Sequence, residues 1–123
     1  MKQAAILIVD DNPEIREIIQ ILLTGEGFQV HEAANGTQAL SQLKENIFDL
    51  IILDIMMPGL NGYQTCVEMR KLTNAPILFL SARTQESDKT LGFSSGGDDY
   101  LAKPFSYAEL VSRAKALLRR YQV

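Results

Sequence analysis

Three aspartates directly follow two strongly apolar segments of the sequence. Asp10 and Asp11 come after residues 4–9, and Asp54 comes after residues 50–53. Both segments are typical of strands that are covered on both faces, as in a parallel sheet. Carboxylates brought close together repel one another, which raises their pKa values unless a cation relieves them. Oxygen ligands of this kind suit Mg²⁺, which keeps several waters and also binds phosphate oxygens.

Two further polar residues lie at the ends of strand-like segments. Ser81 follows residues 77–80, and Lys103 is the last residue of 99–103, directly before Pro104. A hydroxyl and an ammonium group that face clustered carboxylates and Mg²⁺ would bind the anionic oxygens of a phosphoryl group. Each residue alone has an ordinary role, as a turn residue or a surface charge. Their shared position at strand ends predicts one common site.

The elements that must position these residues alternate along the chain. Residues 30–33 alternate in polarity and predict an edge strand, which brings the expected strands to five. Five helices are expected between and after them, beginning at Asn12-Pro13, after Asn35-Gly36, over 63–72, over the weakly patterned 86–96 and at the capping box Ser106-x-x-Glu109. This alternation predicts an α/β fold, a doubly wound parallel sheet of flavodoxin-like order 2-1-3-4-5. In that order the first and third strands are neighbours, so the three aspartates converge.

Composition limits the classes of protein and of site. The chain has 123 residues, 46% of them hydrophobic, which is typical of one globular domain. One cysteine, Cys66, excludes an internal disulfide, and one histidine, His31, excludes a multi-histidine metal centre. We expect His31 to be solvated and Cys66 to be half-buried. The net charge of −3 argues against direct nucleic-acid binding, and no apolar run predicts a membrane segment, so we expect a cytoplasmic protein.

Four motifs extend over essentially the whole chain, in the order ILIVDDNPEIR, DLIILDIMMPGLNG, ILFLSA and GGDDYLAKPF. Together they resemble the motifs of the receiver domain of two-component response regulators, the CheY-like superfamily. The resemblance implies a single receiver domain over residues 1–123, with no output domain in this chain. It also implies a signalling switch that assists its own phosphorylation and dephosphorylation, not a conventional enzyme.

The resemblance assigns roles to the acidic residues. Asp54 would accept a phosphoryl group from a sensor histidine kinase. Asp11 and Asp54 would bind Mg²⁺ directly, together with the backbone carbonyl of Met56. Asp10 would act through a metal-bound water.

The resemblance also assigns roles to the residues around the phosphate. Lys103 would pair with the phosphate, and Ser81 would supply the hydroxyl that follows it. Tyr100 matches the aromatic residue that changes position in the switch. The peptide bond between Lys103 and Pro104 is expected to be cis.

The segment DDYLAKPF more closely resembles the OmpR-like branch, whose members carry a C-terminal winged-helix DNA-binding domain. This implies control of transcription through a DNA-binding domain that lies outside this chain. It also implies a homodimer on phosphorylation, through the fourth helix, fifth strand and fifth helix. Charges there predict pairs across the interface between Lys89 and Glu109, and between Asp98 or Asp99 and Arg113. Exposed pairs contribute only about 0–1 kcal/mol each, so we expect a weak, salt-sensitive dimer.

Two other functions use similar chemistry. A Mg²⁺-dependent phosphohydrolase would also use an aspartate nucleophile, but such enzymes place a second Asp two residues later, where this chain has Met56. A flavin- or nucleotide-binding module would share the fold, but no glycine-rich phosphate loop follows the first strand. The acidic segment DDNPE over residues 10–14, which stands at that position, would repel a phosphate that carries no metal.

Overall fold

A five-stranded parallel sheet forms the centre of the protein. The computed structural model describes residues 3–81 and 94–121 of the chain. The strands lie in the order β2-β1-β3-β4-β5, which confirms the predicted topology. Their bounds are β1 Ala5–Val9, β2 Gln29–Ala33, β3 Leu50–Asp54, β4 Ile77–Ser81 and β5 Asp99–Ala102.

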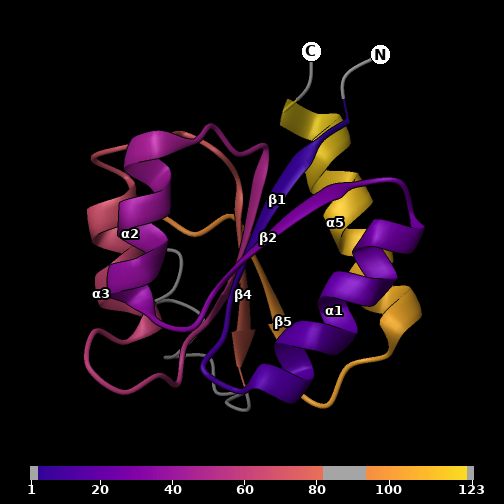
Figure 1. Ribbon diagram of the computed structural model, residues 1–123, viewed down its shortest axis with the longest axis horizontal. Coiled ribbons are helices and arrows are strands. Elements are labelled where there is room, and N and C mark those ends of the chain that lie inside the picture. Colours follow the sequence, from indigo (N-terminus) through magenta and orange to yellow (C-terminus); the bar gives the residue numbers. More distant parts are fainter. Residues whose placement is uncertain (1–2, 82–93, 122–123) are drawn as a thin grey trace.

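Helices cover both faces of this sheet. The helices of the described residues are α1 Pro13–Gly25, α2 Gly36–Glu45, α3 Gly62–Met69 and α5 Tyr107–Tyr121. Figure 1 shows α2 and α3 on one side of the sheet and α1 and α5 on the other. The helix predicted over residues 86–96 falls mostly outside the described residues. None of the helices in the described part combines the length and apolar character needed to span a membrane.

The alternation of side chains along the strands produces two hydrophobic layers. β1, β3 and β4 are buried throughout, as the apolar segments predicted. One layer joins residues such as Leu7, Leu53 and Phe79 to α2 and α3. The other joins Ile8 and Ile52, among others, to α1 and α5. Because both faces are filled, the polar strand ends are left as the place where a ligand can approach.

Asparagine side chains begin three of the helices. Asn12, Asn35 and Asn61 cap α1, α2 and α3, and their side-chain oxygens accept backbone N–H groups of the first turn. α3 ends at Met69, three residues before the predicted end. The reason is a tighter turn, in which the Leu72 N–H donates to the Met69 carbonyl at 2.8 Å.

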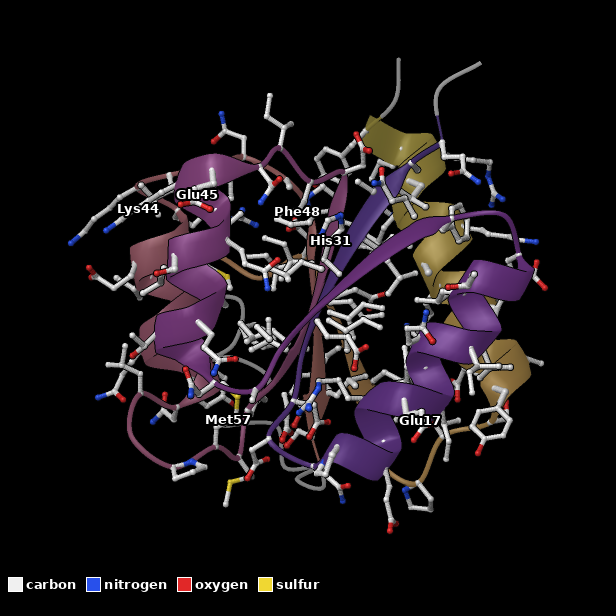
Figure 2. All side chains as sticks on the ribbon, viewed as in Figure 1. Glu17, His31, Lys44, Glu45, Phe48 and Met57 are labelled. Carbon is white, nitrogen blue, oxygen red and sulfur yellow. The ribbon has the colours of Figure 1, made fainter. Side chains whose placement is uncertain are left out.

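His31 is the central residue of the edge strand β2. In Figure 2, His31 lies beside Phe48. The two rings meet edge to face, with their centroids 5.3 Å apart. His31 is therefore half-buried instead of solvated, and Cys66 is fully buried instead of half-buried.

Candidate functional site

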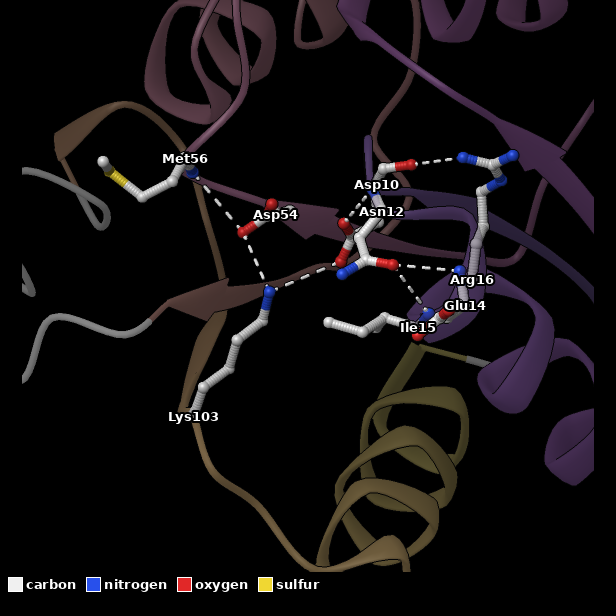
Figure 3. A network of polar contacts seen from close by, with 8 residues as sticks. All are labelled: Asp10, Asn12, Glu14, Ile15, Arg16, Asp54, Met56 and Lys103. Carbon is white, nitrogen blue, oxygen red and sulfur yellow. Dashed lines mark hydrogen bonds and ion pairs between the residues drawn. The ribbon is translucent and has the colours of Figure 1, made fainter.

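The carboxyl ends of four strands bring the predicted polar residues to one edge of the sheet. Asp10 directly follows β1, Asp54 ends β3, Ser81 ends β4, and Lys103 directly follows β5. Figure 3 shows the Lys103 side chain reaching towards Asp10 and Asp54 from across the site. The topology thus places together residues that are up to 93 positions apart in sequence.

The Lys103 ammonium group is shared between two buried carboxylates. Its Nζ lies 3.4 Å from Asp10 Oδ2 and 3.4 Å from Asp54 Oδ1. Asp10 has no exposed surface and Asp54 is 3% exposed. The Met56 backbone N–H also donates to Asp54 Oδ1, at 3.4 Å. These contacts are long for charge-assisted hydrogen bonds, which leaves the carboxylate of Asp54 only partly satisfied.

Asp54 is therefore held in an environment that disfavours its charge. Burial and the Asp10 carboxylate raise the pKa of Asp54 from 3.8 to about 6, against the opposing effects of Lys103 and the Met56 N–H. A carboxylate whose pKa is raised by burial and by a charged neighbour is a common mark of a functional site. The group remains mostly ionised at neutral pH.

Three carboxylates form a set that can hold a divalent cation. One oxygen from each of Asp10, Asp11 and Asp54 lies within 4.8 Å of the others, and Asp11 is exposed. Opposite ligands of an octahedral Mg²⁺ are about 4 Å apart, so small movements would bring these oxygens to bonding distance. The exposed side of the cluster leaves room for the waters that Mg²⁺ retains. The donor set fits Mg²⁺ in charge, ligand type and spacing.

Arg16 is part of the site, although its sequence position did not predict it. Its guanidinium Nη1 donates to the Asp10 carbonyl at 2.7 Å, and its Nε lies 3.2 Å from Glu32 Oε1. A signal was present in the sequence. The first 54 residues contain nine acidic residues, and their basic residues are Lys2, Arg16 and Lys44. Arg16 is therefore the basic residue nearest in sequence to the acidic pair, five residues after Asp11, which makes it a candidate partner for that site.

Gly62 is a second residue that sequence reasoning missed. It begins α3 directly behind Asp54, and its N–H donates to the Ile55 carbonyl at 2.9 Å. A Cβ atom at position 62 would lie 2.6 Å from the Asp54 carbonyl oxygen and 2.6 Å from Ile55 Cα. Glycine is therefore required for the helix to approach the end of β3 this closely.

Ser81 ends β4, Tyr100 lies on the adjacent β5, and Lys103 directly follows β5. Ser81 is fully buried, and its carbonyl accepts the Lys103 backbone N–H at 2.6 Å. Tyr100 pairs with Phe79 across the strands, and its ring is buried in the layer under α2 and α3. The peptide bond between Lys103 and Pro104 is cis.

The charged residues of the predicted dimer face have partners within the chain. Arg113 Nη1 lies 3.0 Å from Asp99 Oδ1, and its Nη2 lies 3.5 Å from Glu109 Oε2. Asp98 accepts from Arg70 at 2.7 Å and from the Tyr121 hydroxyl at 2.8 Å.

Lys115 pairs with Glu26 at 2.5 Å. Lys89 lies outside the described residues. Asp99, Glu109 and Arg113 thus lie together at the β5–α5 edge, with Arg113 adjacent to both acids.

Comparison with known proteins gives a consistent result. The family model for the response regulator receiver domain matches residues 6–115. The chain is 50% identical over 118 residues to the transcriptional regulatory protein YrkP of Bacillus subtilis, covering 96% of this chain and 51% of that protein. It is 48% identical over 115 residues to the CpxR homolog of Haemophilus influenzae, a transcriptional regulatory protein, covering 94% of this chain and 50% of that protein. The chain therefore spans about half the length of these curated relatives.

A solved structure of the response regulator TrrA from Thermotoga maritima, in complex with Mg²⁺ and BeF, is also similar. It aligns with a TM-score of 0.84 and 36% identity, covering 94% of this chain and 99% of that one. The matched residues include both acidic strand ends, Ser81 and Lys103. The chain belongs to the response regulator receiver domain family, and it forms the receiver domain of a two-component response regulator.

Proposed function

We propose that Asp54 accepts a phosphoryl group and that the domain switches state in response. One observation carries this proposal. The Asp54 carboxylate is buried at the end of β3, its charge is only partly satisfied, and it lies 3.4 Å from the Lys103 ammonium beside two further carboxylates. A phosphoryl acceptor needs such a positioned oxygen with cationic groups ready for the incoming oxygens.

In the transfer, an ionised Asp54 oxygen would form a bond to phosphorus. The phosphorus–nitrogen bond of a kinase phosphohistidine would break, and the imidazole would leave with the electron pair of that bond. Lys103 would remain beside the phosphoryl oxygens and offset part of their charge. Ser81 would supply a hydroxyl to the same oxygens from the end of β4.

Asp10, Asp11 and Asp54, together with the Met56 carbonyl, would hold Mg²⁺ at this site. When bound, the ion would supply positive charge for the oxygens of the transferring group. Without it, Lys103 is the cation that the described residues place between the two buried carboxylates.

The switch would pass through Ser81 and Tyr100. Ser81 ends β4 and Tyr100 lies on the adjacent β5, next to Phe79. A phosphoryl group that draws in the Ser81 hydroxyl would change the space available to the Tyr100 ring. The two states need to differ by only a few kcal/mol for such a switch to respond.

The partners follow from the family and from the length of the relatives. We propose a sensor histidine kinase as the phosphoryl donor and a DNA-binding output domain outside residues 1–123, since the relatives are about twice as long. We propose a weak homodimer of the phosphorylated form through the β5–α5 edge. Asp99, Glu109 and Arg113 would exchange their pairings within the chain for pairings across a two-fold axis.

Acetyl phosphate provides a test that needs no kinase. The protein is incubated with Mg²⁺ and acetyl phosphate, and its intact mass is measured. We expect the gain of one phosphoryl group, and no gain when Mg²⁺ is chelated. A wild-type protein that gains no mass with Mg²⁺ and fresh acetyl phosphate would contradict the proposal. A mass gain that persists in Asp54→Asn would also contradict it, because a residue other than Asp54 would then be the acceptor.

A further inference from the structure

Arg16 connects α1, the loop after β1 and the edge strand β2. It lies in the first turn of α1, and its side chain is 19% exposed. One nitrogen donates to the Asp10 carbonyl at 2.7 Å, and another lies 3.2 Å from the Glu32 carboxylate on β2. Figure 3 shows the guanidinium group meeting the Asp10 carbonyl on the side away from Lys103. The contact is thus with the backbone of the acidic site and not with its carboxylates.

This contact completes the set of partners around Asp10. The Asp10 N–H donates to the Ala33 carbonyl at 3.2 Å. Its Oδ1 accepts the Asn12 N–H at 2.9 Å, and its Oδ2 faces Lys103. With Arg16 on the carbonyl, every polar atom of Asp10 has a partner. A buried carbonyl that lost its donor would have to move or remain unsatisfied.

The Asp10 carbonyl belongs to the peptide group that leads into Asp11. Because a peptide group is planar, holding its oxygen fixes the plane and the position of the Asp11 Cα atom. Among the described residues, none contacts the exposed Asp11 carboxylate through a hydrogen bond or an ion pair. The backbone is therefore the part of Asp11 that the fold controls.

We propose that Arg16 is a positioning residue, which fixes the Asp10–Asp11 peptide and so aims the Asp11 carboxylate at the cation site. The inference rests on the proposed function, because it assumes that these carboxylates bind Mg²⁺. It assigns Arg16 no contact with the ion or with the phosphoryl group. Glu32 acts one step further away, by holding the guanidinium group against the carbonyl.

Charge and positioning predict opposite effects when Arg16 is replaced. Removal of a positive charge near an acidic site reduces the repulsion of Mg²⁺, which would tighten binding. Loss of the carbonyl contact releases the Asp10–Asp11 peptide, which would weaken binding. Residues that orient metal ligands change metal affinity by about 10–100-fold when they are mutated. We expect the lower end of that range, about tenfold, because Asp10 keeps its other partners.

The test compares Mg²⁺ affinity in four variants of the full chain. Arg16→Met keeps an aliphatic stem but removes the donor group, and Arg16→Lys keeps the charge without the planar fork. Glu32→Gln leaves the arginine but removes its ionic partner. Lys115→Met is the matched control, because it breaks the ion pair with Glu26 at the other end of α1. Amide chemical shifts of residues 10–12 and 54–57 report both the ion titration and the metal-free geometry.

We expect Arg16→Met to bind Mg²⁺ about tenfold more weakly, Arg16→Lys and Glu32→Gln to be intermediate, and Lys115→Met to match the wild type. The metal-free amide shifts of Asp11 and Asn12 should move in Arg16→Met. Equal or tighter binding by Arg16→Met would overturn the inference. If Arg16→Met does not fold, the Arg16→Lys variant is used in its place. An Arg16→Lys protein that binds Mg²⁺ with the affinity of the wild type would then overturn the inference. A wild-type protein that does not bind Mg²⁺ would refute both the proposed function and the role of Arg16. Mg²⁺ binding by the wild type, with the same affinity in the Arg16 variant, would refute the role of Arg16 alone.

Discussion

Replacing Asp54 by asparagine should stabilise the metal-free protein at neutral pH. The Asp54 carboxyl has a pKa of about 6 in the folded chain, raised from 3.8 by burial and by Asp10. Above both values, this difference corresponds to about 3 kcal/mol against the folded state. Asparagine has nearly the shape of a protonated carboxyl and carries no charge. Its amide needs hydrogen-bond partners of its own, so we expect a net gain of about 1–3 kcal/mol in the free energy of unfolding.

The sign gives this prediction a characteristic pH dependence. The folded chain binds the Asp54 proton more tightly than the unfolded chain, because its pKa is raised. The stability of the wild type therefore falls as pH rises from about 4 to about 6, and this contribution is constant above that range. Asp54→Asn does not lose stability in this way, because asparagine does not titrate. The difference between the two proteins should be small near pH 4 and reach its full size by pH 7.

Urea unfolding with a metal chelator, at several pH values between 4 and 8, measures this difference. Asp11→Asn is the control, because water already solvates its exposed carboxylate and the change in stability should be smaller. Addition of Mg²⁺ should stabilise the wild type more than Asp54→Asn, since ligand binding favours the folded state. Equal stability of wild type and variant at pH 7.5, or a difference that does not vary with pH, would refute the reasoning.

Three further variants test other parts of the site and its surroundings. Lys103→Met leaves two buried carboxylates without their shared ammonium, so urea unfolding at pH 7 should show a loss of about 1–3 kcal/mol; an unchanged midpoint would mean that the 3.4 Å pairs contribute nothing. Gly62→Ala places a methyl group 2.6 Å from the Asp54 carbonyl oxygen and should cost about 1–3 kcal/mol by the same assay. Gly25→Ala, which has nothing within 4 Å, should not destabilise, and an equal loss in both variants would argue against crowding as the cause. Arg113→Glu should keep the beryllofluoride-loaded protein monomeric in sedimentation at low salt, where the wild type should dimerise; a dimer that survives the charge reversal would exclude this edge as the interface.

The sheet and the acidic cluster could be predicted because both depend on local patterns. β1, β3 and β4 are apolar in every position that the core needs, and each is followed or ended by a polar residue. Once the strand order is known, those strand ends must meet. Asp10, Asp54 and Lys103 could therefore be placed together without knowledge of any side-chain contact.

The remaining contacts depend on packing between distant elements. Arg16 could have paired with any of several nearby acids, and only the position of α1 against β2 directs it to the Asp10 carbonyl and Glu32. The packing of α5 beside β5 places Arg113 3.0 Å from Asp99 of its own chain, and its pairing across a dimer interface stays a prediction. His31 was expected in water, but the loop before β3 brings Phe48 against its ring.

Localisation of the phosphoryl group tests the central claim most directly. The protein is treated with Mg²⁺ and acetyl phosphate and then reduced with borohydride, which converts an aspartyl phosphate to homoserine. Peptide mass mapping then identifies the converted residue. We predict conversion at Asp54, with none at Asp10 or Asp11 and none in a chelated control. Conversion at either of the other aspartates, or a phosphorylated protein that gives no homoserine at position 54, would contradict the assignment of Asp54 as the phosphoryl acceptor.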